Sequence, residues 1–210
     1  MNKILISPSL LAADFGKINE EVGSVESADW LHLDIMDGHF VPNITFGPEV
    51  IKNIKTNLFK DCHLMISEPE KYLDDFVGAG AGGISFHVEA VKNYQNLILK
   101  IKENSLKAGL AVKPKTDIEK ILSIIDSLDY VLIMSVEPGF GGQRFMSEVL
   151  EKIKKIREIN KEVMIQVDGG INFETAKLAI SAGANNLVAG SYIFNAENRQ
   201  LAINALKNIL

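Results

Sequence analysis

Short hydrophobic segments alternate with longer amphipathic segments along the whole chain. The hydrophobic segments are typical of buried β-strands and cover residues 4–9, 30–36, 59–66, 83–88, 108–113, 129–136, 163–168 and 186–190. The amphipathic segments predict helices near residues 15–26, 47–56, 69–79, 92–106, 117–126, 147–160, 172–182 and 197–209. Eight strands alternating with eight helices predict an α/β fold, a parallel sheet closed into a compact (β/α)8 TIM barrel.

The length of the chain suits one such barrel. At 210 residues, the barrel would have few insertions in its loops. No linker or low-complexity segment interrupts the alternation of strands and helices. We therefore expect a single catalytic domain over residues 1–210.

Composition argues against several classes of partner. The net charge of −5 and the absence of a Lys/Arg block argue against binding to nucleic acid. The densest basic group, within residues 152–157, has the spacing of a solvated helix face. No segment approaches the roughly 20 apolar residues of a membrane span. The single cysteine, Cys62, leaves no internal disulfide and is typical of a protein of the reducing cytoplasm.

The strand predicted over residues 30–36 is apolar on one face and polar on the other. Because successive side chains of a strand point to opposite faces, Leu31 and Leu33 share one face. His32 and Asp34 share the other face. Leucines suit packing against helices, whereas a buried imidazole or carboxylate needs a polar partner. Something polar must therefore lie opposite His32 and Asp34.

Polar residues and glycines collect where the predicted strands end. The segments that end or follow the strands are 7–9, 32–42, 63–65, 87–89, 113–114, 137–142, 168–170 and 190–191. They contain all four histidines and the densest glycine clusters of the chain. Active sites of TIM barrels lie at the carboxyl ends of the strands. The sequence therefore predicts one polar site at this end of the barrel.

A divalent-cation site is one interpretation of the polar residues. The candidate ligands come from three predicted strands and are His32, Asp34, His63 and Asp168. Two imidazoles and two carboxylates around one axis suit Zn²⁺, Fe²⁺, Mn²⁺ or Co²⁺. A buried His–Asp network without a metal fits the same spacing, because no local metal-binding motif is present. The opposite parity of Cys62 directs its thiol toward the helices.

The two aspartates suggest proton transfer on both faces of a substrate. Asp34 and Asp168 come from different strands and could stand on opposite sides of a bound molecule. Removal of a proton by one and return by the other would invert a stereocentre. A proton next to a ketone is weakly acidic, and a cation beside the developing enediolate would lower the barrier.

Three glycine clusters predict a phosphate site. They follow the last three strands and consist of Gly139, Gly141 and Gly142, of Gly169 and Gly170, and of Gly190 before Ser191. Glycines let the backbone approach a ligand closely and present N–H groups to it. Helix N-termini after strands seven and eight would add their positive ends. We therefore expect a phosphorylated substrate.

Smaller features complete the predicted site. Ser9 ends the first strand and could hydrogen-bond a substrate hydroxyl. Met36, Met65 and Met134 end three other strands and could form an apolar wall around an enediolate. His87 is interpreted as a hydrogen-bonded wall residue in preference to a ligand.

Five motifs resemble those of the ribulose-phosphate 3-epimerase family. They are Ser7-Pro8-Ser9-Leu10, His32-Leu33-Asp34-Ile35-Met36-Asp37-Gly38-His39-Phe40-Val41-Pro42-Asn43, His63-Leu64-Met65, Val136-Glu137-Pro138-Gly139-Phe140-Gly141-Gly142-Gln143 and Val167-Asp168-Gly169-Gly170-Ile171. The resemblance covers nearly the whole chain. It implies a TIM barrel that interconverts D-ribulose 5-phosphate and D-xylulose 5-phosphate in the pentose phosphate pathway.

The resemblance also implies a role for each site residue. His32, Asp34, His63 and Asp168 would bind one divalent cation, with Zn²⁺ preferred and Fe²⁺, Mn²⁺ or Co²⁺ open. Asp34 would accept the proton and Asp168 would donate it. Ser9 and His63 would contact the sugar. The phosphate end would be surrounded by Gly139, Phe140, Gly141, Gly142, Asp168, Gly169, Gly170, Gly190 and Ser191. A cytoplasmic homo-oligomer is expected, with the number of subunits open.

Other functions stay open at this point. An allulose-6-phosphate 3-epimerase would use the same chemistry on a ketohexose phosphate. A metal-free phosphate-binding lyase or isomerase would need His32 and His63 only as hydrogen-bonding groups. A non-catalytic sugar-phosphate binder explains least, because it would not require two opposed carboxylates.

Overall fold

Eight parallel strands form the centre of the molecule in a computed structural model that describes residues 3–209. The strands are β1 (Leu5–Pro8), β2 (Trp30–Met36), β3 (Phe59–Met65), β4 (Gly83–His87), β5 (Lys107–Val112), β6 (Tyr130–Met134), β7 (Met164–Asp168) and β8 (Asn186–Ala189). They pair in the order β1-β8-β7-β6-β5-β4-β3-β2. A parallel bridge between Ser9 and His32 joins β1 to β2 and closes the barrel. The predicted (β/α)8 barrel is therefore confirmed.

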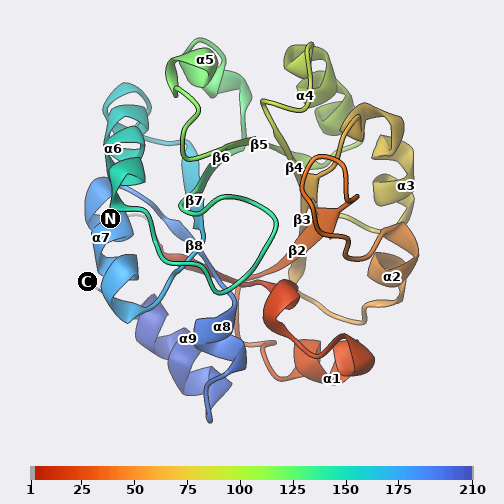
Figure 1. Cartoon of the computed structure of the whole chain (residues 1–210), viewed down its shortest axis with the longest axis vertical. Coiled ribbons are helices and arrows are strands. Elements are labelled where there is room, and N and C mark those ends of the chain that lie inside the picture. The colour runs from red at the N-terminus through yellow and green to blue at the C-terminus, as the bar shows by residue number, and fades with distance from the viewer. Residues whose placement is uncertain (1–2, 210) are drawn as a thin grey trace.

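A ring of helices surrounds this barrel (Figure 1). They are α1 (Ile18–Gly23), α2 (Pro48–Asn53), α3 (Leu73–Gly78), α4 (Tyr94–Glu103), α5 (Glu119–Leu122), α6 (Leu150–Ile159), α7 (Phe173–Ala182), α8 (Ser191–Phe194) and α9 (Arg199–Lys207). The strands match the predicted segments within two residues at either end. The predicted domain, 1–210, includes Met1, Asn2 and Leu210, which lie outside the described residues.

The helices are shorter than the amphipathic pattern predicts. The segment predicted as one helix over 15–26 divides into a 3-10 turn, Phe15–Lys17, and α1. Asp14 accepts the Gly16 N–H at the start of that turn, and the backbone of Lys17 then leaves helical geometry. Helix α8 was not predicted, because four residues directly after a strand are too few to show helical periodicity.

The alternation of side chains along β2 separates two apolar regions. Leu31, Leu33 and Ile35 are buried in the large cluster between the sheet and the helices. Met36 and Met65 belong to a separate small cluster with Val41, on the other face of the sheet. Each fully buried leucine contributes about 1.5–3 kcal/mol through removal of apolar surface from water. The outer face of β2 therefore anchors the strand and leaves its inner face available for polar groups.

The densest basic group is not the solvated helix face that its spacing predicts. Lys152 on α6 donates to the carbonyl oxygens of Lys113, Pro114 and Thr116 and is half-buried. Arg157 donates to the Gly183 carbonyl, after α7. These cations satisfy loop carbonyls that would otherwise lack partners, so their role is structural.

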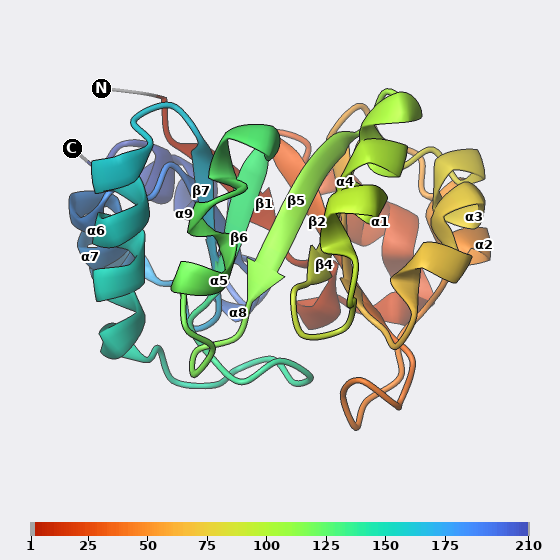
Figure 2. The same ribbon diagram turned by 90° about the horizontal axis from the view of Figure 1, so that it is seen from above.

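The strands present their carboxyl ends at one end of the barrel. The loops after β2 and β6 project furthest at that end (Figure 2). The loop after β6 also lies across the middle of the barrel in the axial view (Figure 1). Among residues 3–209, no helix has the length and apolar character needed to cross a membrane.

Candidate active site

Four predicted ligands converge inside the barrel at the carboxyl ends of β2, β3 and β7. His32, Asp34, His63 and Asp168 each offer one ligand atom, and these atoms all lie within 4.8 Å of one another. The parallel register explains part of the convergence, because it places Asp34 beside His63. Three of the four residues are buried, and the Asp168 side chain is 16% exposed. The predicted cluster therefore exists in the fold.

A buried carboxylate holds the inner nitrogen of His32. His32 Nδ1 lies 2.8 Å from Asp61 Oδ2, in a position without solvent exposure. Tyr130 Oη and Gln166 Nε2 donate to the same carboxylate at 2.7 Å each. Burial lowers the pKa of His32, but the charges of Asp34 and Asp61 outweigh it and raise the pKa well above its usual value. Asp61 therefore fixes the ring with Nε2 directed at the cluster.

His63 is backed differently, by a second imidazole. Its Nε2 lies 2.9 Å from His87 Nε2, and His87 Nδ1 lies 3.2 Å from Glu89 Oε2. Its Nδ1 faces Asp34 Oδ1 at 3.3 Å. Burial lowers the pKa of His87 to about 4, so this ring is neutral at physiological pH. The preference for His87 as a hydrogen-bonded residue agrees with these contacts.

The two oxygens of Asp34 face different surroundings. Oδ1 lies 3.5 Å from His32 Nε2 and 3.3 Å from His63 Nδ1. Oδ2 accepts a hydrogen bond from Ser9 Oγ at 2.7 Å. Burial raises the pKa of Asp34, but the charge of His32 and hydrogen bonds from the two histidines outweigh it and lower the pKa. Asp34 is therefore a carboxylate at neutral pH.

Asp168 at the end of β7 has the opposite electrostatic character. Burial, followed by the neighbouring Asp34 carboxylate, raises the pKa of Asp168 to about 7. Ser135 Oγ donates to the backbone carbonyls of Asp168 and Gly169 at 2.9 Å and 2.7 Å. These bonds hold the strand end in place while the carboxyl group stays free. Two aspartates of opposite protonation preference therefore share one site.

The donor set fits a divalent cation. His32 Nε2 is buried and has no hydrogen-bond partner among the described residues. His63 Nδ1 and Asp34 Oδ1 face each other at 3.3 Å as a nitrogen and an oxygen that both offer lone pairs. An unpartnered buried nitrogen is costly, and a cation would satisfy both arrangements. Asp61 behind His32 is the hydrogen-bonded carboxylate that commonly orients a metal-ligating histidine.

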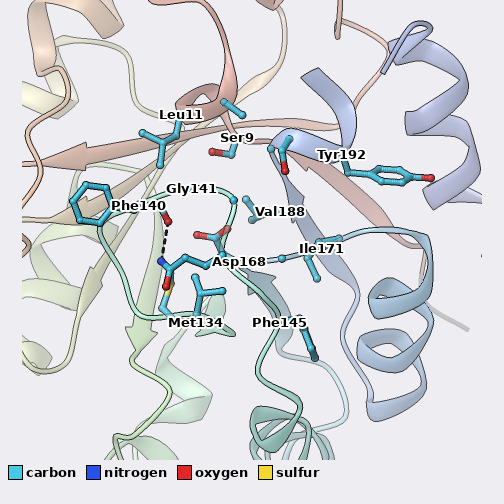
Figure 3. Close-up of a pocket in the computed structure, with 18 of the residues that line it drawn as sticks. Ser9, Leu11, Met134, Phe140, Gly141, Phe145, Asp168, Ile171, Val188 and Tyr192 are labelled. Carbon is cyan, nitrogen blue, oxygen red and sulfur yellow. Dashed lines mark hydrogen bonds between the residues drawn. The ribbon is translucent and has the colours of Figure 1, made fainter. Parts of the chain in front are cut away.

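A cavity of about 600 Å³ opens beside the cluster. Asp168 lies near the middle of this cavity, between Met134 and Ser9 (Figure 3). The other predicted contact residues on its wall are Ser9, Gly139, Phe140, Gly141, Gly142, Gly169, Gly170, Gly190 and Ser191. Met36, Met65 and Met134 also line it, as the predicted apolar wall requires. His63 is fully buried behind Asp34 and does not line the cavity.

Glycine is required where the loop after β7 meets the loop after β6. Gly170 has φ +62°, and a Cβ there would lie 2.6 Å from Phe145 N. Gly169 has φ +122°, and its Cβ would lie 2.6 Å from Val136 Cγ2. Larger residues would push these loops apart. The backbone at the end of β7 is therefore tightly packed at the edge of the cavity.

The helix N-terminus after β7 is already satisfied. Asn172 caps α7, and its side chain accepts from Glu174 N–H and Thr175 N–H. The dipole of α7 still contributes there, but these two N–H groups are not available to a ligand. The free N–H groups of the glycine loops and of Ser191, at the start of α8, are the stronger candidates for phosphate contacts.

Two residues behind the ligands escaped the sequence analysis. Asp61 has the same strand parity as His63, so alternation alone would place it inside the barrel. The β2–β3 register then sets it beside His32. Glu89 follows His87 by two residues in the segment after β4 and returns to bond its ring. Parity could have found Asp61, whereas the position of Glu89 depends on a turn.

Comparison with known proteins decides the family. A family model described as the Ribulose-phosphate 3 epimerase family matches residues 5–194. The chain belongs to this family. The membership confirms the resemblance inferred from the five motifs and makes the protein an isomerase of the epimerase type.

Relatives from distant organisms agree. The ribulose-phosphate 3-epimerase of Bacillus subtilis (strain 168) is 46% identical over 213 residues, which cover 97% of this chain and 98% of the relative. The enzyme of the same name from Schizosaccharomyces pombe (strain 972 / ATCC 24843) is 44% identical over 97% of this chain and 92% of the relative. Both alignments span almost all of the barrel that holds the epimerase-family site.

Solved structures share the fold at low sequence identity. A 3-hexulose-6-phosphate synthase superposes with a TM-score of 0.71 at 18% identity, covering 99% of this chain and 100% of the other. KGPDC from Streptococcus mutans, in complex with a sugar phosphate, gives a TM-score of 0.73 at 15% identity, covering 98% and 96%. These similarities extend the TIM-barrel architecture beyond the epimerase family.

Proposed function

We propose that the protein interconverts D-ribulose 5-phosphate and D-xylulose 5-phosphate by metal-dependent two-base epimerisation at C3. The observation that carries the proposal is the pair of aspartates in one cavity, Asp34 ionised and Asp168 with a pKa near 7. Membership of the epimerase family supports the reaction class. The names of the relatives support the pentose phosphate substrate.

Asp34 is the proposed base. Ser9 orients Oδ2 by a hydrogen bond of 2.7 Å, while Oδ1 belongs to the ligand cluster. One oxygen can therefore stay with the cluster while the other takes the C3 proton. The lowered pKa keeps Asp34 ionised, which a base requires before it reacts.

Asp168 is the proposed acid. Its pKa of about 7 leaves much of the population protonated near neutral pH. It would deliver its proton to the opposite face of C3 and so invert that centre. Asp34 then holds one proton and Asp168 has lost one, and exchange with solvent restores both groups. The reverse reaction exchanges their roles.

His32, Asp34, His63 and Asp168 would hold the divalent cation. Bound there, it would supply positive charge that stabilises the negative charge developing on the enediolate oxygens. Zn²⁺ is the preferred ion for a set of two imidazoles and two carboxylates, with Fe²⁺, Mn²⁺ and Co²⁺ as alternatives. Met36, Met65 and Met134 would exclude water from the enediolate.

The glycine loops are proposed to bind the phosphate. Gly169, Gly170, Gly190 and Ser191 offer backbone N–H groups at the same cavity as Asp168. Gly139, Phe140, Gly141 and Gly142 would cover the substrate from the loop after β6. The proposed sugar contact of His63 would be made through Asp34. The solved KGPDC complex supports sugar-phosphate binding by a barrel of this shape.

A side-by-side assay tests the proposed substrate and metal. Protein depleted of metal with a chelator and then restored with Zn²⁺ is given D-ribulose 5-phosphate or D-allulose 6-phosphate. We expect turnover of the pentose phosphate only after restoration, by at least about 10²-fold over the depleted protein. Preference for the hexose phosphate would favour the allulose-6-phosphate 3-epimerase alternative. Full activity without metal would contradict the Lewis-acid part.

The cellular setting and assembly are also proposals. A rice relative is named a cytoplasmic isoform, and the one cysteine of this chain, Cys62, is a buried free thiol. Both agree with a cytoplasmic enzyme. We also propose a homo-oligomer, which light scattering of the purified protein would test.

A further inference from the structure

We propose that His87 and Glu89 are positioning residues that fix the tautomer of His63, and thereby set how tightly the four-residue cluster holds a divalent cation. The inference rests on the proposed function for the presence of a cation. It adds two residues, from β4 and the segment after it, that touch neither the cluster's centre nor the cavity.

The three side chains form a continuous chain of hydrogen bonds. His63 Nε2 lies 2.9 Å from His87 Nε2, and His87 Nδ1 lies 3.2 Å from Glu89 Oε2. The two imidazoles are fully buried, whereas 19% of the Glu89 side chain is exposed. The chain therefore runs from the metal cluster to the rim of the barrel without a break.

The protons in this chain can be assigned from the carboxylate end. Glu89 Oε1 accepts the Lys113 N–H at 3.0 Å, which marks the carboxylate as an acceptor. His87 Nδ1 must then donate to Oε2, so its Nε2 carries the lone pair and accepts from His63 Nε2. His63 consequently keeps its Nδ1 lone pair. That lone pair faces Asp34 Oδ1 at 3.3 Å, where only a cation or an added proton relieves the repulsion.

The reversed chain is disfavoured. If His63 Nδ1 carried the proton, His87 would donate from Nε2 and present a lone pair to Glu89. That contact requires a protonated Glu89. Burial alone would raise the pKa of Glu89, but hydrogen bonds, led by that from His87, lower it to about 2. The ionised carboxylate therefore selects the tautomer of His63 that can bind a metal.

Ring stacking holds His87 in register for this task. The Phe40 ring lies 4.8 Å from the His87 ring, and Lys113 Nζ lies 3.9 Å from the centre of the Phe40 ring. His87 therefore has a packed neighbour on its face as well as partners at both nitrogens. An aromatic substitute at residue 87 would preserve the packing and remove only the acceptor.

Two substitutions and one matched control test the inference. His87→Phe removes the acceptor, and Glu89→Gln removes the charge but keeps the shape. Ser85→Ala is the control, because Ser85 is equally buried on β4 and its Oγ has no hydrogen-bond partner among the described residues. Zn²⁺ affinity is measured by chelator competition. The ¹⁵N shifts of the His63 ring are measured in the metal-free proteins.

We expect weaker Zn²⁺ binding by about 10–100-fold for His87→Phe, a smaller loss for Glu89→Gln, and less than a twofold change for Ser85→Ala. The shifts should show an unprotonated His63 Nδ1 in the wild type and partial protonation in the two variants. Unchanged affinity and tautomer in both variants would overturn the inference and leave the proposed function standing. A wild type that binds no Zn²⁺ would overturn both. Because Glu89 lies at the rim, its variant tests the idea even if His87→Phe fails to fold.

Discussion

The two ends of the cavity recognise a ligand by different means. At one end His32, Asp34 and His63 are buried side chains on strands, each held by a polar neighbour. At the other end Gly139, Gly142 and their counterparts after β7 present backbone from loops. The first end carries charge that was removed from water, whereas the second carries fixed peptide dipoles beside solvent.

This difference predicts different responses to substitution. A buried ligand or base that loses one partner leaves another buried polar group unsatisfied, which costs about 1–3 kcal/mol or more. A loop that changes shape still has solvent for its N–H groups. Substitutions at the side-chain end should therefore reduce chemistry and metal binding. Substitutions at the backbone end should reduce affinity for the phosphate.

The largest effect is expected at the two aspartates. Asp34→Asn and Asp168→Asn keep the side-chain shape but remove the base and the acid. We expect kcat to fall by at least about 10³-fold for each, measured with D-ribulose 5-phosphate. Circular dichroism and thermal melting check that the barrel is intact. Near-normal turnover in either folded variant would break the distinction between the ends.

A smaller effect, of another kind, is expected at Gly170. Gly170→Ala introduces a Cβ at 2.6 Å from Phe145 N and strains a backbone with φ +62°. The loops after β6 and β7 must then separate, and we expect KM to rise by about 10–100-fold while Zn²⁺ affinity stays within twofold. Gly23→Ala is the control, since its Cβ meets nothing within 4 Å. A fall in Zn²⁺ affinity at Gly170→Ala would show that the two ends are coupled.

Strand positions were predictable from the sequence because alternation has a fixed period. His32, Asp34 and His63 were placed inside the barrel by parity, and they lie there. The stagger between strands was not predictable, since it depends on how the whole sheet closes. Asp61 shows this limit: its parity is readable, but its contact with His32 depends on the register of β2 and β3.

Loop geometry was less accessible to sequence reasoning. The glycines after β6 and β7 were expected at the cavity and line it. The capping of α7 by Asn172 was not foreseen, because a side chain there can either cap the helix or leave its N–H groups free. Helix α8 and Glu89 depend on short turns whose direction is set by tertiary packing.

The third effect concerns the stability of the metal-free protein. In the folded state the pKa of Asp168 is raised from 3.8 to about 7, so between these values the folded protein binds more protons than the unfolded chain. Its stability therefore falls as pH rises through this window. Asp168→Asn removes the penalty, and we expect this variant to be about 1–3 kcal/mol more stable than wild type at pH 8.

Urea unfolding of both metal-free proteins between pH 4 and pH 8 measures this difference. The gain should shrink steadily as pH falls toward about 4. A constant gain across the range would mean that Asp168 is ionised throughout. The aspartates would then lack the opposite protonation preferences on which their proposed roles depend.

The smallest effect is expected at Cys62, beside His63 in sequence but on the opposite face of β3. Its thiol is fully buried in the apolar layer, and burial raises its pKa. We expect no labelling of the native protein by iodoacetamide and no loss of activity. Mass spectrometry after treatment, with urea-unfolded protein as the positive control, measures this. Rapid labelling would show that strand parity fails next to the site.

Turnover of D-ribulose 5-phosphate in D₂O tests the central claim most directly. With two bases, the proton taken by Asp34 is not the one delivered by Asp168. Early D-xylulose 5-phosphate should therefore carry deuterium at C3, while the remaining D-ribulose 5-phosphate stays unlabelled. Product that retains its original hydrogen, or substrate that gains deuterium as fast as product forms, would contradict the two-base account.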